Sequence, residues 1–166
     1  MQQKIRRISE MTFTDASGRV RTLLSPREFE NMNIPAGTLN ADEWRDMRSH
    51  AAKSREFLCQ IPWSEDLSQI SNIAGWHHEK LNGSGYPDGL MGDQIPVQVR
   101  ILTICDIFDA MTAADRPYRK AASVDRTSAA LEEESRAGLL DVELVQLFNE
   151  GVVPQLVREG MVPAGN

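Results

Sequence analysis

Cysteines, long apolar runs and positive charge are all scarce in this chain, and each scarcity excludes a class of protein. The 166 residues include two cysteines, Cys59 and Cys105, too few for the disulfide framework of a small secreted domain, so we expect reduced thiols. No apolar run is long enough to cross a bilayer, and the basic segment 4–7 is not followed by the apolar core of a signal peptide. These absences predict a soluble, cytoplasmic chain without membrane insertion.

The charge balance is acidic, with 18 Lys and Arg against 24 Asp and Glu and a net charge of −6. Proteins that bind duplex nucleic acid contact its phosphates through a basic surface, so this balance argues against such a partner. A small anionic nucleotide needs only a local cationic pocket and is not excluded. Hydrophobic residues make up 41% and charged residues 25%, which is ordinary for one globular domain with a real core.

Histidine is also scarce, and two of the three histidines are adjacent: the chain has His50, His77 and His78, with Glu79 directly after the pair. Imidazoles with carboxylates suit transition metals. Adjacent helical residues point about 100° apart, so His77 and His78 cannot easily bind one ion while both are helical. Either each histidine reaches a different metal, or the helix unwinds at this end. A surface histidine beside a buried one is the alternative. The glycine-rich loop that follows makes metal binding the better explanation. His50, beside an apolar helical stripe, is on its own most simply structural.

The loop at residues 82–92 carries four glycines, among them Gly83 and Gly85, followed by Tyr86 and Pro87. Glycine lets the backbone approach a ligand closely, and proline presents the tyrosine ring on a stiff turn. We expect an exposed, ordered loop on which a base stacks or a protein docks. A plain connection between helices is the alternative.

Two aspartates interrupt an apolar segment that follows Pro96, and two arginines lie soon after it. Asp106 and Asp109 share one face of the predicted helix. Since a buried carboxylate needs a metal or a cation, the alternatives are a metal site and a pairing with Arg100 or Arg116. Arginine pairs bidentately with phosphate, so the cluster Arg116, Arg119 and Lys120 is either a phosphate clamp or a solvated basic turn.

The remaining pattern is helical apart from its start. Alternating residues around Asp15 to Gly18 predict a hairpin, and no helical pattern precedes Ser25. Helix starts are indicated by Ser25, by Asn40 with Glu43, by Ser123 and by Asp141. A further helix is predicted from Ser64 or Glu65 to about His78, with Leu67 in its buried stripe. The apolar segment after Pro96 predicts a central helix that is buried nearly all round. We predict an all-α bundle of about five helices with a short irregular or hairpin N-terminal arm. The expected limits are an arm at 1–38, a helical domain at 39–153 and a frayed tail at 154–166.

The run HHEKLNGSGYPDGLMGDQIPVQVRILTICDIFDAMTAADRPYRKA resembles the signature half of the HD-GYP domain, a branch of the HD phosphohydrolases. The resemblance implies hydrolysis of cyclic di-GMP to pGpG or GMP in bacterial signalling, at a centre of two or three metals. It implies that the metal ligands are His50, His77, His78 and Asp106. It implies substrate contacts from Tyr86, Arg116, Arg119 and Lys120. The supporting motif residues that it implies are Glu79, Gly83, Gly85, Pro87 and Asp109. Mixed histidine and carboxylate ligation favours iron or manganese.

One departure from the family leaves the activity open. The family carries an upstream His-Asp pair, whereas none of the three histidines here precedes an aspartate. The chain is then a piece of a longer enzyme, or a degenerate relative that binds cyclic di-GMP or a GGDEF-domain partner without cleavage. A third alternative is that further ligands come from Glu28, Glu30 or Asp42, or from a second chain in a homodimer.

Overall fold

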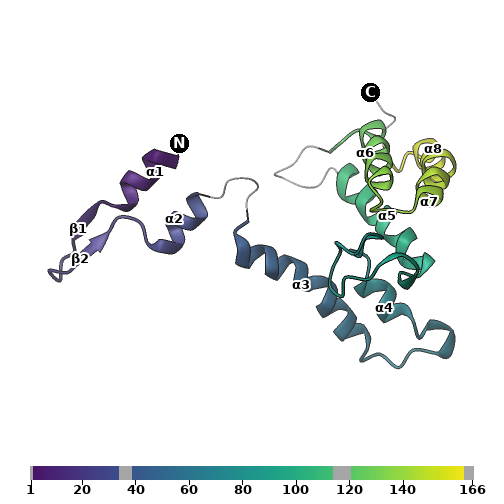
Figure 1. The fold of residues 1–166 in the computed structure, drawn as a ribbon, viewed down its shortest axis with the longest axis horizontal. Helices are drawn as coiled ribbons and strands as arrows, with labels where there is room; N and C mark the ends of the chain where they lie inside the picture. The colour runs from purple at the N-terminus through teal and green to yellow at the C-terminus, as the bar shows by residue number, and fades with distance from the viewer. Residues whose placement is uncertain (1, 34–38, 114–120, 163–166) are drawn as a thin grey trace. The chain divides into compact units, whose positions relative to one another are not determined.

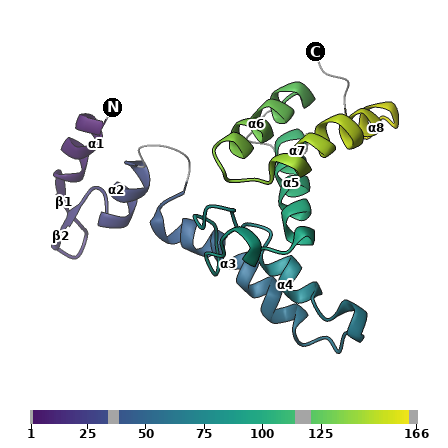
Figure 2. The same cartoon turned by 45° about the vertical axis from the view of Figure 1, so that its right-hand side comes forward.

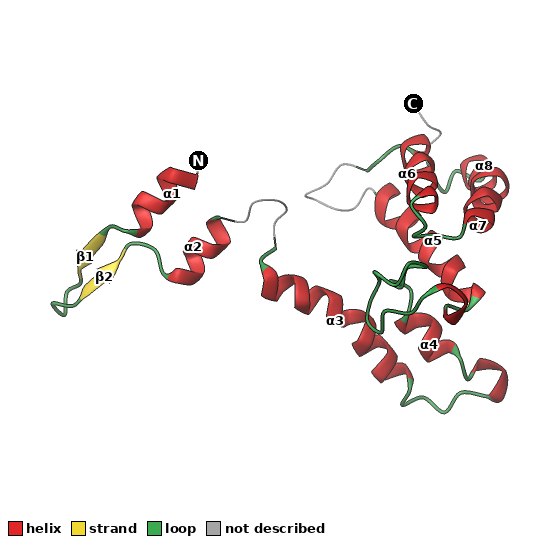
Figure 3. Ribbon diagram, viewed as in Figure 1, coloured by secondary structure: helices red, strands yellow, loops and turns green. Residues whose placement is uncertain are grey.

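The computed structural model describes residues 2–33, 39–113 and 121–162. They are mainly helical, and their strands form one two-stranded sheet (Figure 3). This confirms the predicted all-α class. The chain forms two compact units, residues 1–47 and 48–166, which divide inside a helix. The domain limits at residues 38 and 153 stay predictions.

The first unit begins with a helix that the sequence analysis missed. Helix α1 (Gln2–Ser9) precedes β1 (Thr12–Thr14), β2 (Val20–Thr22) and α2 (Pro26–Met32) (Figure 1). The strands pair antiparallel, with Phe13 opposite Arg21, so the predicted hairpin is confirmed. The expectation of no helix before Ser25 is wrong. Among the eight residues of α1 only Ile5 and Ile8 are apolar, too few to establish a helical period.

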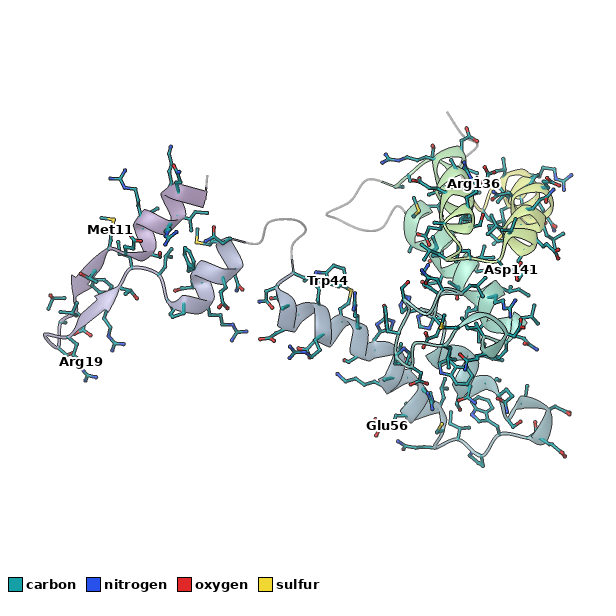
Figure 4. The ribbon with its side chains drawn as sticks, viewed as in Figure 1. Met11, Arg19, Trp44, Glu56, Arg136 and Asp141 are labelled. Atoms are coloured by element: carbon teal, nitrogen blue, oxygen red, sulfur yellow. The ribbon has the colours of Figure 1, made fainter. Side chains whose placement is uncertain are left out.

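The predicted helix starts are confirmed. Ser25 and Glu28 form a reciprocal capping box at α2. At α3 (Ala41–Leu58), Asn40 Oδ1 accepts from the Glu43 amide at 3.0 Å, and Glu43 Oε2 accepts from the Asn40 amide at 2.8 Å. Figure 4 labels Trp44 in the first half of α3 and Glu56 near its end.

The second predicted helix, from Ser64 or Glu65 to about His78, is shorter than expected. A 3₁₀ turn, η1 (Glu65–Leu67), precedes α4 (Ile70–Gly75), so His77 and His78 lie beyond the helix. Leu67 is exposed, although it was expected in the buried stripe. Beyond the glycine-rich loop come η2 (Gly92–Gln94) and α5 (Val97–Thr112).

Helix α5 is central, as predicted, but it is not buried on all sides, contrary to the prediction. Its buried residues are Val99, Thr103, Ile104, Phe108 and Thr112. In the described part of the chain the opposite positions Ile101 and Leu102 are exposed, as is Cys105. The helix contacts α4, α6 and α7, and in Figures 1 and 2 these lie toward different ends of it. Hydrophobicity alone therefore overestimated its burial.

The C-terminal helices build the core with α5. They are α6 (Val124–Arg136), α7 (Val142–Leu147), the π turn η3 (Phe148–Val152) and α8 (Val153–Arg158). The caps at Ser123 and Asp141 are confirmed. The core comprises Ile104, Phe108, Val124, Leu131, Leu140, Val145, Phe148 and Val153. The tail predicted to fray from Pro154 instead begins with α8, because Pro154 occupies the first turn, where proline is tolerated. None of the described helices is long and apolar enough to span a membrane.

Candidate metal centre

The three histidines meet although they come from distant segments. His50 projects from α3, whereas His77 and His78 lie in the turn that follows α4. The His50 Nε2 atom lies 3.1 Å from Nε2 of His78 and 3.4 Å from Nε2 of His77. The unwound helix end, one of the two predicted arrangements, is what allows adjacent imidazoles to turn toward the same point.

The spacing of these nitrogens fits a single divalent ion. Metal–nitrogen bonds of about 2.0–2.1 Å place two ligands of a tetrahedral ion about 3.3 Å apart. The observed separations of 3.1 and 3.4 Å match that value. Among the described residues these three form the group of potential donors whose ligand atoms all lie within 4.8 Å of one another.

The hydrogen bonds of His77 select the tautomer that a metal requires. Its Nδ1 lies 2.6 Å from the carbonyl oxygen of Ala74, which can only accept, so Nδ1 carries the proton. The lone pair is then on Nε2, which faces the cluster. The Thr103 hydroxyl of α5 donates to the His77 carbonyl at 2.8 Å and so fixes this turn against the core helix.

His78 is held neutral, as ligation also requires. Burial lowers the pKa of His78 from 6.5 to about 4, and the neighbouring His77 adds to the effect. The Asp106 carboxylate acts in the opposite direction on this pKa, which places its charge near the ring. At neutral pH the His78 imidazole is therefore unprotonated and able to bind a cation.

The two aspartates of α5 have different environments. Asp106 is partly buried and lies near the cluster, although it does not belong to the close group of three donors. Asp109 is exposed, so the prediction of a second buried carboxylate is wrong. Because three residues rotate a helix by about 300°, Asp109 lies about 60° around the helix axis from Asp106. This difference is enough to move the Asp109 side chain out of the packed face. Arg100, one alternative partner, forms an ion pair with Asp141 at 3.1 Å.

Glu79 organises the glycine-rich loop. Its side chain is 2% exposed, and its two carboxylate oxygens accept the backbone N–H groups of Asp88, Gly89 and Leu90 at 2.7, 3.0 and 3.0 Å. Buried carboxylates need such donors. The family resemblance implied a supporting role for Glu79, and its hydrogen bonds connect it to the glycine-rich loop.

The loop also packs directly on the histidine pair. A Cβ on Gly85 would lie 2.4 Å from Glu79 Cα and 2.6 Å from the His78 carbonyl oxygen, so only glycine fits. The Tyr86 ring packs against the His78 ring at a tilt of 33°, with centroids 4.7 Å apart, and the Arg48 guanidinium lies 5.3 Å from the Tyr86 centroid. Gly83 has a φ of +79°, a conformation that favours glycine. Pro87 is exposed on the same loop.

Burial raises the pKa of the Tyr86 phenol; the Arg48 charge opposes that shift and the Asp106 charge adds to it. Tyr86 therefore packs against one ring of the cluster, and the charges of Arg48 and Asp106 act on its phenol. Base stacking on Tyr86 remains a prediction.

Sequence reasoning missed a second carboxylate that holds the loop. Asp88 Oδ2 accepts from the Arg55 guanidinium and, at 2.7 Å, from the Trp76 indole N–H. The Trp76 hydrogen bond and, beyond it, Arg55 lower the pKa of Asp88 against the opposing effect of burial. Arg55 precedes Asp88 by 33 residues, a separation that no local pattern reveals.

The predicted phosphate clamp, Arg116, Arg119 and Lys120, lies outside the described residues.

The comparisons with known proteins point to one family and one reaction class. The family model described as "HD domain" matches residues 18–144. The chain is 43% identical over 97 residues to "3'3'-cGAMP-specific phosphodiesterase 3" of Vibrio cholerae, covering 58% of the chain and 20% of that protein. It is 35% identical over 122 residues to "Cyclic di-GMP phosphodiesterase response regulator RpfG" of Xanthomonas campestris, covering 74% and 32%.

A "Cyclic di-GMP phosphodiesterase" of Thermotoga maritima is 35% identical over 116 residues, covering 69% of the chain and 30% of that relative. The chain therefore spans a fifth to a third of the length of these relatives, with 20% at the lower end and 32% at the upper.

Proposed function

The chain belongs to the HD domain family, and from this premise we propose that its histidine cluster is the metal-binding core of a phosphodiesterase site. The proposed substrate is cyclic di-GMP, hydrolysed to pGpG or GMP in bacterial second-messenger signalling in the cytoplasm. The observation that carries the proposal is the convergence of three Nε2 atoms at the spacing of metal ligands. The names of the relatives supply the class of substrate, since each is a phosphodiesterase of a cyclic dinucleotide.

The proposed ligands are His50, His77, His78 and Asp106. Imidazoles completed by a carboxylate suit iron or manganese. A divalent cation held there would lower the pKa of a bound water and neutralise charge on the phosphodiester. Supporting this assignment, the His77 Nδ1 proton is committed to the Ala74 carbonyl, which leaves Nε2 as the donor to the cation.

Substrate binding is assigned to two regions. Arg116, Arg119 and Lys120 would hold the phosphates through charge-assisted hydrogen bonds. Tyr86, which lies on His78, would define one wall of the site. Gly83, Gly85 and Pro87 lie on the same loop as Tyr86. The Glu79 carboxylate holds the following part of that loop by accepting the Asp88 and Gly89 amides. Asp109 stays a candidate supporting residue.

Four protein ligands satisfy one ion together with water, whereas a centre of two or three ions needs more. We therefore propose that hydrolysis requires further ligands from upstream residues or from a second copy in a homodimer. The specific observation behind this step is that all three histidines of the chain already belong to one cluster.

The same observation favours a second candidate function: a degenerate domain that binds cyclic di-GMP, or a GGDEF-domain protein, without cleavage. The exposed Pro87 on an ordered loop provides a surface for such a partner. Under this alternative, nucleotide binding survives chelation of metal, whereas the hydrolysis proposed above would be lost.

Anaerobic incubation with cyclic di-GMP and Fe²⁺ or Mn²⁺, followed by chromatography of the nucleotides, tests the proposal. If the chain or its homodimer completes the centre, pGpG or GMP appears, and it disappears with His77→Ala or Asp106→Ala. Glu56→Ala is the matched control, because Glu56 is exposed on the same helix as His50 and should leave the products unchanged. Intact substrate together with nucleotide binding that survives chelation would instead support the binding module.

A further inference from the structure

The carboxylate of Asp88 lies where three segments of the second unit meet. It belongs to the glycine-rich loop, and its Oδ2 atom accepts from Arg55 on α3 and from Trp76 at the end of α4. The Arg55 guanidinium also lies 5.4 Å from the centroid of the Trp76 ring. One oxygen atom therefore joins the loop to both segments that supply the imidazoles.

Both partners of Asp88 stand close in sequence to cluster histidines. Arg55 follows His50 by five residues on α3, about 7.5 Å along the helix axis. Trp76 immediately precedes His77, and the Glu79 amide donates to the Trp76 carbonyl at 2.8 Å. Because few residues separate these contacts from the histidines, a displacement of Arg55 would move the His50 imidazole, and a displacement of Trp76 would move the His77 imidazole.

Close packing at Gly75 supports the same junction. A Cβ at this position would lie 2.7 Å from Arg55 Cβ and 2.9 Å from Arg55 Cδ. The absence of a side chain allows α4 to approach α3 at the residue that binds Asp88. Figures 1 and 2 both show the C-terminal half of α3 beside α4.

We propose that Asp88, through Arg55 and Trp76, is a positioning residue that sets the distance between His50 and the pair His77 and His78. The inference rests on the proposed function, because it assumes that the cluster binds a metal. Such sites need their ligands held to within about 0.5 Å, and the two segments are separate in sequence. The Glu79 carboxylate accepts the backbone N–H of Asp88 itself at 2.7 Å and that of Leu90 at 3.0 Å, so the Asp88 side chain extends from a fixed backbone.

The expected effect is on metal binding rather than on global stability. Side-chain exposure is 36% for Arg55 and 41% for Asp88, and an ion pair this exposed adds little to folding. Outer-shell partners of metal ligands, in contrast, typically change metal affinity by about 10–100-fold. A large loss of metal affinity with little loss of stability would therefore distinguish a positioning role from a merely structural one.

The test titrates the full chain and its Asp88→Ala variant with Co²⁺, a spectroscopic probe, following the visible absorption bands that report ligand geometry. We expect Asp88→Ala to weaken Co²⁺ binding about tenfold or more and to change the band pattern, with little change in the melting temperature. Asp93→Ala is the matched control, because Asp93 is a fully exposed aspartate just beyond the same loop.

A second control addresses loss of stability. Val145→Ala removes core packing in α7 and should lower the melting temperature without changing Co²⁺ affinity. If Arg55→Ala and the double variant with Asp88→Ala each weaken binding as much as Asp88→Ala alone, the two residues act as one unit.

Unchanged Co²⁺ affinity and bands in Asp88→Ala, beside a wild-type chain that binds, would overturn the positioning role alone. A wild-type chain that binds no Co²⁺ would overturn the proposed metal site itself, and this inference with it.

Discussion

Two turns in this protein are shaped by a carboxylate that accepts backbone N–H groups, and they differ in what surrounds the carboxylate. In the hairpin of the first unit, Asp15 Oδ1 accepts from the Ser17 and Arg19 amides at 2.9 and 3.1 Å. In the second unit, Glu79 accepts from three loop amides that begin at Asp88. The chemistry of the hydrogen bonds is the same in both.

The difference lies in reach and burial. Asp15 bonds residues two and four positions ahead, and its side chain is 24% exposed. Glu79 bonds residues nine to eleven positions ahead and is 2% exposed. Water can replace lost bonds at Asp15 but has poor access to Glu79. A local carboxylate therefore shapes a turn, whereas a buried one with long reach fixes a loop against the site.

Removal of the buried carboxylate should have the largest effect. We expect Glu79→Ala to lower the free energy of unfolding by about 2–4 kcal/mol, because three N–H groups lose their acceptor. Chemical denaturation of the second unit measures the loss. Glu133→Ala, exposed on α6, should stay within about 0.5 kcal/mol of wild type. Equal stabilities for these two variants would mean that water reaches the loop amides after all.

A methyl group at Gly85 should have the next largest effect. Its Cβ would lie 2.4 Å from the backbone nitrogen of Lys80, which cannot move independently of the histidine pair. We expect Gly85→Ala to cost about 1–3 kcal/mol and to speed amide hydrogen exchange in the loop. Wild-type exchange rates in this variant would show that the loop is not packed as tightly as the distances indicate.

The matching change in the hairpin should be smaller. A Cβ on Gly18 meets nothing within 4 Å, so the cost comes from its φ of +80° alone. We expect Gly18→Ala to cost about 1 kcal/mol and to speed hydrogen exchange only across β1 and β2. An effect larger than that of Gly85→Ala would reverse the comparison.

The smallest effect is a pH dependence of the hairpin. Hydrogen bonds from the Ser17 hydroxyl and the Arg19 amide lower the pKa of Asp15 from 3.8 to about 2. Because the folded pKa is the lower one, this contribution to stability is complete above about pH 4 and is lost as pH falls toward 2. Amide chemical shifts of Ser17 and Arg19 report it. Asp15→Asn should abolish the step, and a persistent step would assign it to another group.

Much of the local structure could be predicted because it depends on short-range chemistry. The capping residues Ser25, Asn40, Ser123 and Asp141 accept hydrogen bonds from amides three residues away, and all four helix starts are confirmed. The exception is α1, whose two apolar residues carry too weak a period.

Burial was predicted less well, because it depends on what lies opposite each face. Leu67, Ile101 and Leu102 have the residue types of a core, yet each is exposed in the described structure. Buried Ser71 and Thr103 were not anticipated for the converse reason. Residue type sets the tendency to be buried, and the packing partner decides the outcome.

The sequence by itself determined the helical class and the glycine-rich loop, since these follow from residue types and short spacings. The metal-ligand roles of His50 and Asp106 came instead from the resemblance to a family. Only the tertiary structure decided that α4 ends before His77, that the three Nε2 atoms converge, and that Asp88 joins the loop to Arg55 and Trp76. The reason is physical: contacts between residues 12 to 33 positions apart depend on how rigid elements pack, and no local pattern records that packing.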